Sequence, residues 1–210
     1  MKRIFFILIT ICFLTVAMGQ VTKMSIPDLP KNNAIKISLL SPIAATLNLS
    51  HEYKLNSFWS LQNGLAITSL KLTDTDQKSY GFEGFQYSLD IRKYRKNKID
   101  WNGWYHQFFL RYAQYTYHNY RQDSITQNKV IQLKEDLQGI NLGYAFGYQK
   151  VFQNKYIIDS YVGYYISIPT YYSANLSEET ILKYKLNSLK ENPITSTAGL
   201  RIGLKVGYLF

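Results

Sequence analysis

Hydrophobic and polar residues alternate along much of the chain, most regularly in residues 197–210. Side chains on a β-strand point to opposite faces in turn, so this period of two predicts a strand. One face carries Ala198, Leu200, Ile202, Leu204, Val206, Tyr208 and Phe210, and the other carries Thr197, Gly199, Arg201, Gly203, Lys205 and Gly207. An apolar face toward lipid and a small or charged face toward a lumen are typical of a membrane β-barrel strand.

The same alternation predicts eight strands, at residues 34–41, 46–55, 58–69, 80–93, 104–117, 137–150, 156–168 and 196–210. The lipid-facing rows of the middle strands are Leu47, Leu49, Tyr53 and Leu55; Trp59, Leu61, Leu65 and Ile67; Phe85, Tyr87, Leu89 and Ile91; Phe108, Leu110 and Tyr112; and Ile140, Leu142, Tyr144, Phe146 and Tyr148. We therefore predict an all-β fold, an eight-stranded antiparallel up-and-down transmembrane β-barrel over residues 34–210.

The predicted connections differ in length at the two ends of the barrel. Turns at 56–57, 94–103 and 151–155 would face the periplasm, and connections at 42–45, 70–79, 118–136 and 169–195 would face outward, the asymmetry known for these barrels. Trp59, Trp101, Trp104 and Tyr105 fall near the predicted periplasmic rim, where we expect an aromatic girdle. In the last loop, leucines at helical spacing predict a short amphipathic helix over 177–190, with Asn175 and Glu178 at its start.

The N-terminal residues have the features of a secretory signal peptide. Residues 1–19 combine Lys2 and Arg3 with an apolar stretch and a small-x-small end at Ala17 and Gly19. We expect this segment to be removed, which leaves residues 20–33 as a periplasmic N-terminal segment. The only cysteine, Cys12, lies within the leader, so the mature protein would have no disulfide. The expected location is the outer membrane of a Gram-negative cell envelope.

Charge narrows the class of partner. The formal net charge of the chain is +10, and a secreted chain has little access to nucleic acid, so anionic lipid phosphates are the nearer partner. Candidates for binding lipopolysaccharide phosphates are the basic residues of the predicted outer loops, Arg121, Lys129, Lys134, Lys183, Lys185 and Lys190. Solvated loop charge explains these residues equally well.

The predicted lumen-facing rows contain charges of both signs. Candidates for salt bridges inside the barrel are Glu52, Lys54, Asp90, Arg92, Arg111, Asp159, Arg201 and Lys205, together with Lys36. Eight strands enclose an interior only wide enough to be filled by side chains. We therefore predict a closed lumen, and salt bridging explains pairs such as Glu52 with Lys54 better than acid/base catalysis does.

Motifs for catalysis, cofactor binding or metal binding do not emerge from the sequence. The three histidines, His51, His106 and His118, lack metal-ligand spacing. Neither a GxSxG nucleophile motif nor a glycine-rich phosphate loop occurs. The sequence thus predicts no catalytic residue, no cofactor and no metal, and each histidine is expected to make hydrogen bonds at the rim or in the lumen.

Three stretches carry a resemblance to known proteins: AIKISLLSPIAATLNLSHEYKLNSFWSLQ (residues 34–62), GFQYSLDIRKY (84–94) and WYHQFFLRYAQYTYH (104–118). They are similar to a family of functionally uncharacterised barrels of Gram-negative envelopes. The signal peptide, the eight alternating strands and the terminal Phe210 resemble, more broadly, small bacterial outer-membrane barrels of the OmpA/OmpX type, with a porin-like fold. The resemblance implies that the barrel-assembly machinery recognises the terminal aromatic, Phe210. It implies no catalytic residue, because lipid-A deacylase barrels use a histidine two residues before a serine, and none of the three histidines here fits that pattern.

We therefore expect a non-enzymatic outer-membrane barrel that acts structurally or through its outer loops, with outer-membrane lipid and lipopolysaccharide as neighbours. Two alternatives remain open from the sequence. One is a lipid-modifying outer-membrane barrel enzyme, and the other is a secreted, soluble barrel that holds a small ligand. The glycine-lined strand faces argue against the soluble barrel, whose polar face should carry long charged side chains.

Overall fold

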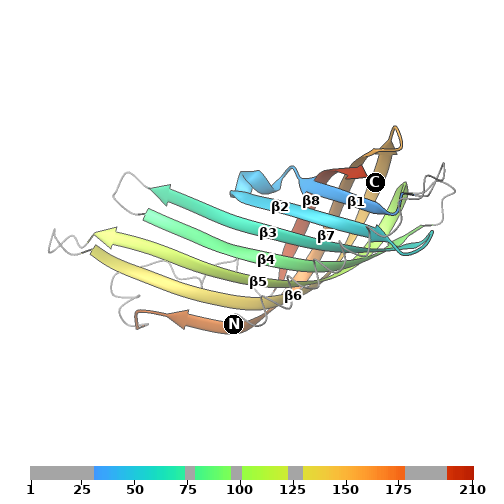
Figure 1. The fold of residues 1–210 in the computed structure, drawn as a ribbon. Helices are drawn as coiled ribbons and strands as arrows, with labels where there is room; N and C mark the ends of the chain where they lie inside the picture. Colours follow the sequence, from blue (N-terminus) through green and yellow to red (C-terminus); the bar gives the residue numbers. More distant parts are fainter. Residues whose placement is uncertain (1–30, 74–78, 96–100, 123–129, 178–197) are drawn as a thin grey trace.

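Eight antiparallel β-strands close into a barrel in chain order in the computed structural model (Figure 1), which describes residues 31–73, 79–95, 101–122, 130–177 and 198–210. The strands are β1 (Asn33–Ser38), β2 (Thr46–Lys54), β3 (Trp59–Thr73), β4 (Ser79–Tyr94), β5 (Gly103–Gln122), β6 (Val130–Phe152), β7 (Tyr156–Ala174) and β8 (Ala198–Leu209), with a 3-10 helix, η1 (Ser41–Ala44), between β1 and β2. The predicted fold class is confirmed. Across the described ranges, no helix has the length and hydropathy that a membrane span requires.

Both ends of the barrel domain meet at one rim, which we call the terminal rim. Asn33 N donates to Phe210 O at 3.2 Å, and Phe210 N donates to Asn33 O at 2.9 Å. The turn between β6 and β7 lies at this rim and occupies only residues 153–155, where Gln153 and Asn154 adopt positive φ angles of 51° and 53°. The opposite end, which carries η1, is called the far rim.

The strands on one side of the barrel run much further toward the far rim than the alternation predicted. β5 has 20 residues and β6 has 23, so the loop predicted at 118–136 is wrong for most of its length, and only residues 123–129 separate these strands. β3 and β7 likewise continue into the loops predicted at 70–79 and 169–195. Figure 1 shows these long, curved strands projecting past the short β1 and β2.

Polar residues that pair across these extensions explain why the alternation in the sequence does not predict them as strands. Thr116 Oγ1 donates to Asp136 Oδ1 at 2.6 Å, and Asn175 Oδ1 accepts from Lys134 N at 2.7 Å. Neither face of such a segment is uniformly apolar, so the period-two signal fades while backbone pairing continues. Asn175 is thereby engaged with β6, and the helix predicted over 177–190 lies outside the described residues apart from Ser177.

The two faces of the wall are chemically distinct. Leu200 and Ile202 on the outward face of β8 are 68% and 60% exposed, whereas Lys36 and Glu52 in the lumen are fully buried. Asn63 is a polar residue on the outward face of β3, and its side-chain oxygen accepts a hydrogen bond from Tyr87 OH at 2.8 Å. Pairing Asn63 with the tyrosine reduces the free energy needed to hold an amide against an apolar environment.

Two members of the predicted aromatic girdle instead lie inside the barrel. Trp101 is 5% exposed, donates from Nε1 to Lys31 O at 2.6 Å and packs with Ala34, Ile157 and Leu209. Tyr105 is fully buried, since its position on β5 points inward. Trp104, one residue earlier, is 47% exposed and stacks on Phe146, as the girdle prediction requires.

Four aromatic rings in the lumen each lie over a glycine of β6 or β8. The cross-strand pairs are Tyr105 with Gly147, Phe109 with Gly143, Tyr161 with Gly203, and Tyr165 with Gly199. A Cβ atom added at any of these glycines would clash with the ring. The four-residue glycine spacing in β6 and β8 therefore matches the spacing of inward rings on β5 and β7.

Replacing Gly203 with alanine is expected to lower the free energy of unfolding by about 1–3 kcal/mol, because the new methyl group overlaps the Tyr161 ring. Urea unfolding in detergent micelles, followed by tryptophan fluorescence, measures this change. Gly81→Ala is the control, since the nearest atom to its added Cβ is 3.5 Å away, at His118 Cβ. Equal destabilisation by the two substitutions would contradict the ring-over-glycine explanation.

Candidate functional site: the polar core of the lumen

A closed ring of two cations and two carboxylates crosses the lumen near the terminal rim. Lys36 Nζ donates to Glu52 Oε2 and, at 2.8 Å, to Asp159 Oδ2. Arg92 Nη1 donates to the same two oxygens at 3.1 and 2.7 Å. All four side chains are fully buried. We call these residues the ion ring, and they connect β1, β2, β4 and β7 through the barrel axis.

Neutral donors occupy the remaining carboxylate oxygens of the ion ring. Glu52 Oε1 accepts from Ser60 Oγ and, at 2.7 Å, from Tyr94 OH, and Asp159 Oδ1 accepts from Tyr105 OH. The Arg92 guanidinium also lies 4.4 Å from the centre of the Tyr105 ring. Such additional hydrogen bonds are what allow a buried ion pair to offset the desolvation of its charges.

A second polar layer lies next to the ion ring and is centred on Asp90. Its Oδ2 atom accepts from Arg201 Nη2 at 3.2 Å, from Gln62 Nε2 at 2.8 Å and from Gln107 Nε2 at 2.9 Å. The Arg201 guanidinium packs 4.1 Å from the centre of the Phe109 ring. This layer adds β3, β5 and β8 to the strands that are connected through the lumen.

Strand alternation places these side chains in the lumen, but the barrel geometry decides which of them meet. Asp159 stands opposite Lys205 in the β7–β8 register, yet its carboxylate bonds to Lys36 and Arg92. Lys205 Nζ donates instead to Ser50 Oγ at 3.0 Å. The contacts thus run across the lumen rather than along the sheet.

The predicted lumen residues fall into two groups. Ion pairs join Glu52 with Arg92, Asp159 with Arg92, and Asp90 with Arg201. The other predicted lumen residues have different neighbours: Lys205 bonds to Ser50, Lys54 Nζ lies 5.6 Å from the Trp101 ring centre, and Arg111 lies 5.6 and 5.7 Å from the ring centres of Phe109 and Tyr165.

The candidates for binding lipid phosphates are only partly described. Arg121 and Lys134 belong to β5 and β6 rather than to a loop, and Lys134 Nζ lies 3.9 Å from Asp136 Oδ2. Lys129, Lys183, Lys185 and Lys190 lie outside the described residues. Phe210, the candidate assembly signal, is 52% exposed at the terminal rim.

Neutral partners of the ionic layers were missed as site residues. They are Ser60, Gln62, Tyr94, Tyr105, Gln107 and Gln149. Each occupies an inward position, so its odd or even place in the strand alternation (its parity) was the signal that could have identified it. Parity alone does not say which inward amide or hydroxyl reaches a carboxylate.

The histidines lie on the outward face, near the terminal rim in the case of His51. A His51 ring nitrogen pairs with Asn33 Oδ1 at 3.0 Å, and His106 Nδ1 hydrogen bonds with Tyr144 OH. Within the part of the chain that the structure describes, no group of three or more histidine, cysteine, aspartate or glutamate side chains could hold a metal ion. The side chains that meet in the described lumen do so through ion pairs, hydrogen bonds and contacts between cations and aromatic rings.

Replacing Asp159 with alanine is expected to lower the free energy of unfolding by about 3–5 kcal/mol, because Lys36 and Arg92 would keep their charges but lose one of two carboxylates. Urea unfolding in micelles measures this effect. Glu83→Ala is the control, since its pair with Lys71 is long, at 3.8 Å, and both side chains are exposed, so the loss should stay below about 1 kcal/mol. Similar losses for both variants would mean that the ion ring does not stabilise the barrel.

Comparison with solved structures supports the fold assignment. Acinetobacter baumannii CarO matches with a TM-score of 0.50 and 11% sequence identity, over 87% of this chain and 97% of CarO. Acinetobacter baumannii CarO2 matches with a TM-score of 0.49 and 11% identity over 87% and 98% of the two chains, and the N-terminal β-barrel domain of Pseudomonas aeruginosa OprF with 0.38 and 12% over 86% and 98%. At such low identity, the likeness to CarO shows the fold alone, a β-barrel.

Comparison with curated proteins finds no match. The model of one protein family, described as a protein of unknown function (DUF3575), matches residues 4–208, which is nearly the whole chain. The barrel with the ion ring in its lumen is therefore a member of the DUF3575 family.

Proposed function

We propose that this protein is a non-enzymatic β-barrel of the bacterial outer membrane, with a sealed lumen and an interaction surface at its far end. The sealed lumen carries the proposal. Lys36, Glu52, Arg92 and Asp159 are fully buried and bonded to one another across the axis. A solute would have to break several charge-assisted hydrogen bonds in a medium of low dielectric constant to pass, so transport through the barrel is disfavoured.

Membrane residence is supported by the outward face. Large apolar side chains such as Leu200, Ile202 and Tyr164 are 60% or more exposed on the wall, and the closed sheet pairs its strands all the way around. A bilayer requires both properties, because unpaired backbone groups are unfavourable in hydrocarbon.

The proposed route includes removal of the leader at residues 1–19, which leaves 20–33 in the periplasm, and recognition of Phe210 by the barrel-assembly machinery. The terminal rim would then face the periplasm.

The far end supplies the surface that a sealed barrel could use. A tilted transmembrane strand needs about 9–11 residues. β5 and β6, with 20 and 23 residues, exceed this by roughly ten residues, which corresponds to about 30 Å of strand beyond the bilayer. Side-chain bonds such as that of Asn175 to Gln132 O, at 3.0 Å, tie the projecting strands together. The proposed partners are lipopolysaccharide or macromolecules at the cell surface.

Reconstitution into planar bilayers is expected to give no sustained ion conductance, because the ion ring and the aromatic rings fill the lumen. A general porin inserted under the same conditions is the positive control. A steady conductance that is measured with the wild-type protein, and not in bilayers without it, would contradict the sealed lumen and favour a channel.

A photocrosslinking residue placed at Gln132, which is exposed on the projecting part of β6, is expected to form adducts on intact cells. The control position is Ser57, which is exposed in the β2–β3 turn at the terminal rim. Mass spectrometry of the adducts identifies a surface partner or lipopolysaccharide. Adducts that form equally well at both positions, or only at Ser57, would contradict an interaction surface at the far end.

A further inference from the structure

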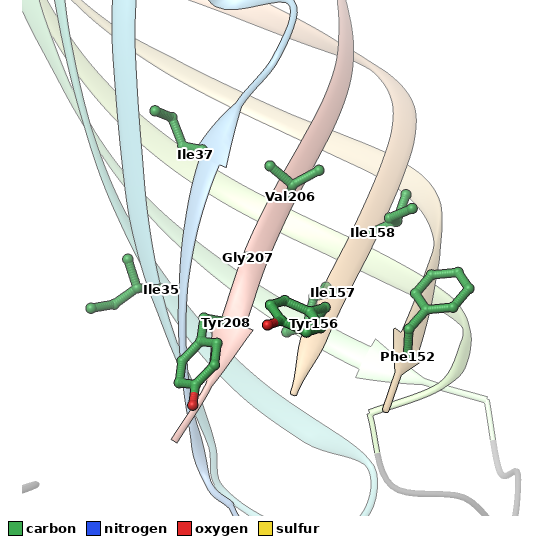
Figure 2. A pocket seen from close by; sticks show the side chains of 9 residues that line it. All are labelled: Ile35, Ile37, Phe152, Tyr156, Ile157, Ile158, Val206, Gly207 and Tyr208. Atoms are coloured by element: carbon green, nitrogen blue, oxygen red, sulfur yellow. The ribbon is translucent and has the colours of Figure 1, made fainter. Parts of the chain in front are cut away.

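An apolar groove of about 540 Å³ lies on the outward wall where β1, β8, β7 and the end of β6 come together at the terminal rim. Figure 2 shows Ile37, Val206 and Ile158 further from the strand ends, and Tyr208, Tyr156 and Phe152 nearer to them. The strand register orders these side chains into two rows. The upper row, away from the rim, is Ile37, Val206, Ile158 and Lys150, and the lower row is Ile35, Tyr208, Tyr156 and Phe152.

The hollow arises from a difference in side-chain size between the rows. Val206 is the smallest side chain of the upper row and lies between two isoleucines, whereas the lower row carries three aromatic rings. Tyr156 and Tyr208 make an edge contact, with ring centres 6.0 Å apart, and form a raised border at the rim. The result is an aliphatic channel bounded by amphipathic rings, which in membrane proteins favour the headgroup level of the bilayer.

Basic side chains surround the rim end of this groove. Lys150 ends the upper row, and its Nζ lies 5.2 Å from the centre of the Phe152 ring, so the ammonium leans over the lower row toward the rim. Lys155 is exposed in the adjacent turn, and Lys31 Nζ donates to Asn154 O of the same turn at 2.9 Å. Long basic side chains near a membrane boundary extend in this way to place their charge at the headgroups.

We infer that this groove is a binding site for one anionic phospholipid of the periplasmic leaflet. An acyl chain lies along the aliphatic row of Ile37, Val206 and Ile158, and the headgroup phosphate meets Lys150, Lys155 of the β6–β7 turn and Lys31, which bonds to that turn. Charge complementarity selects this occupant, because apolar lining alone would accept any acyl chain, whereas the ammonium groups favour a lipid with net negative charge. The inference rests on the proposed outer-membrane residence.

The chain contains a matched site without the groove. Lys93 Nζ lies 5.4 Å from the centre of the Trp59 ring on the outward face of β3 and β4, close to the geometry of Lys150 over Phe152. Neither Lys93 nor Trp59 lines the groove. Comparing variants of the two lysines therefore distinguishes a specific lipid site from general attraction of anionic lipid to a basic rim.

The test is native mass spectrometry of the full barrel released from nanodiscs that contain equal amounts of phosphatidylglycerol and phosphatidylethanolamine. The wild-type protein is expected to retain phosphatidylglycerol preferentially. Lys150→Gln should reduce that preference about fivefold, the effect of one cation at a membrane surface. Lys93→Gln should leave it unchanged. Val206→Trp, which fills the aliphatic row, should remove the retained lipid whatever its headgroup.

Three results would overturn the lipid site: equal retention of the two phospholipids by the wild type, equal effects of Lys150→Gln and Lys93→Gln, or a dimer that Val206→Trp dissociates. The last result would assign the groove to a second copy of the chain. Heat-modifiable electrophoretic mobility shows whether each variant is folded. If Val206→Trp does not fold, the result for Lys150→Gln decides whether the lipid site exists. A protein that fails to enter nanodiscs at all would instead refute the proposed membrane residence.

Discussion

The ion ring of Lys36, Glu52, Arg92 and Asp159 is the constraint on which the rest of the barrel depends. Four charges are buried without exposure to solvent, and each carboxylate is bonded to both cations. A buried charge without its partners is strongly destabilising, so the strands that carry them must close at one register. Because the ring draws on strands from both ends of the sequence, closure of β1 against β8 and pairing of the four ring charges depend on each other.

Space inside the barrel is the second constraint, and the glycines satisfy it. Tyr161 and Phe109 could not lie flat over the neighbouring strands if Gly203 and Gly143 carried side chains. The same rings then cover the Arg201 guanidinium, which lies 5.1 and 4.1 Å from their centres. Cation–aromatic packing thereby joins the second polar layer to the glycine-lined strands, and the lumen is filled from one layer to the next.

The proposed sealed barrel has surface regions that suit different partners. The outward wall suits hydrocarbon, the terminal rim concentrates rings and lysines, and the long strands β5 and β6 carry the far end beyond the closed part of the barrel. Solute passage needs the lumen, whereas lipid selection and surface contact do not. The architecture therefore favours functions carried out on the outside of the barrel over functions carried out through it.

The sequence alone was sufficient for the faces of the strands, because alternation is a local property that each residue shares with its neighbours two positions away. It identified the apolar rows, the glycine rows and the charged character of the lumen. It did not reveal the full length of β5 and β6, since neither face of their outer parts is uniformly apolar and the local period disappears there. The prediction that Trp101 belongs to the aromatic girdle was wrong for a similar reason. Trp101 lies between two strands, where no alternation indicates which way a side chain points.

Only the tertiary structure decided which charges meet. Closure of the barrel brings Asp159 to Lys36 and Arg92, although Lys205 is its neighbour in the sheet, because contacts across the lumen depend on strand tilt and stagger. The groove at the terminal rim depends on closure in the same way, since Ile37 and Ile158 flank Val206 only once β1 pairs with β8. The sequence thus determined what each face is made of, and the closed barrel determined what each side chain touches.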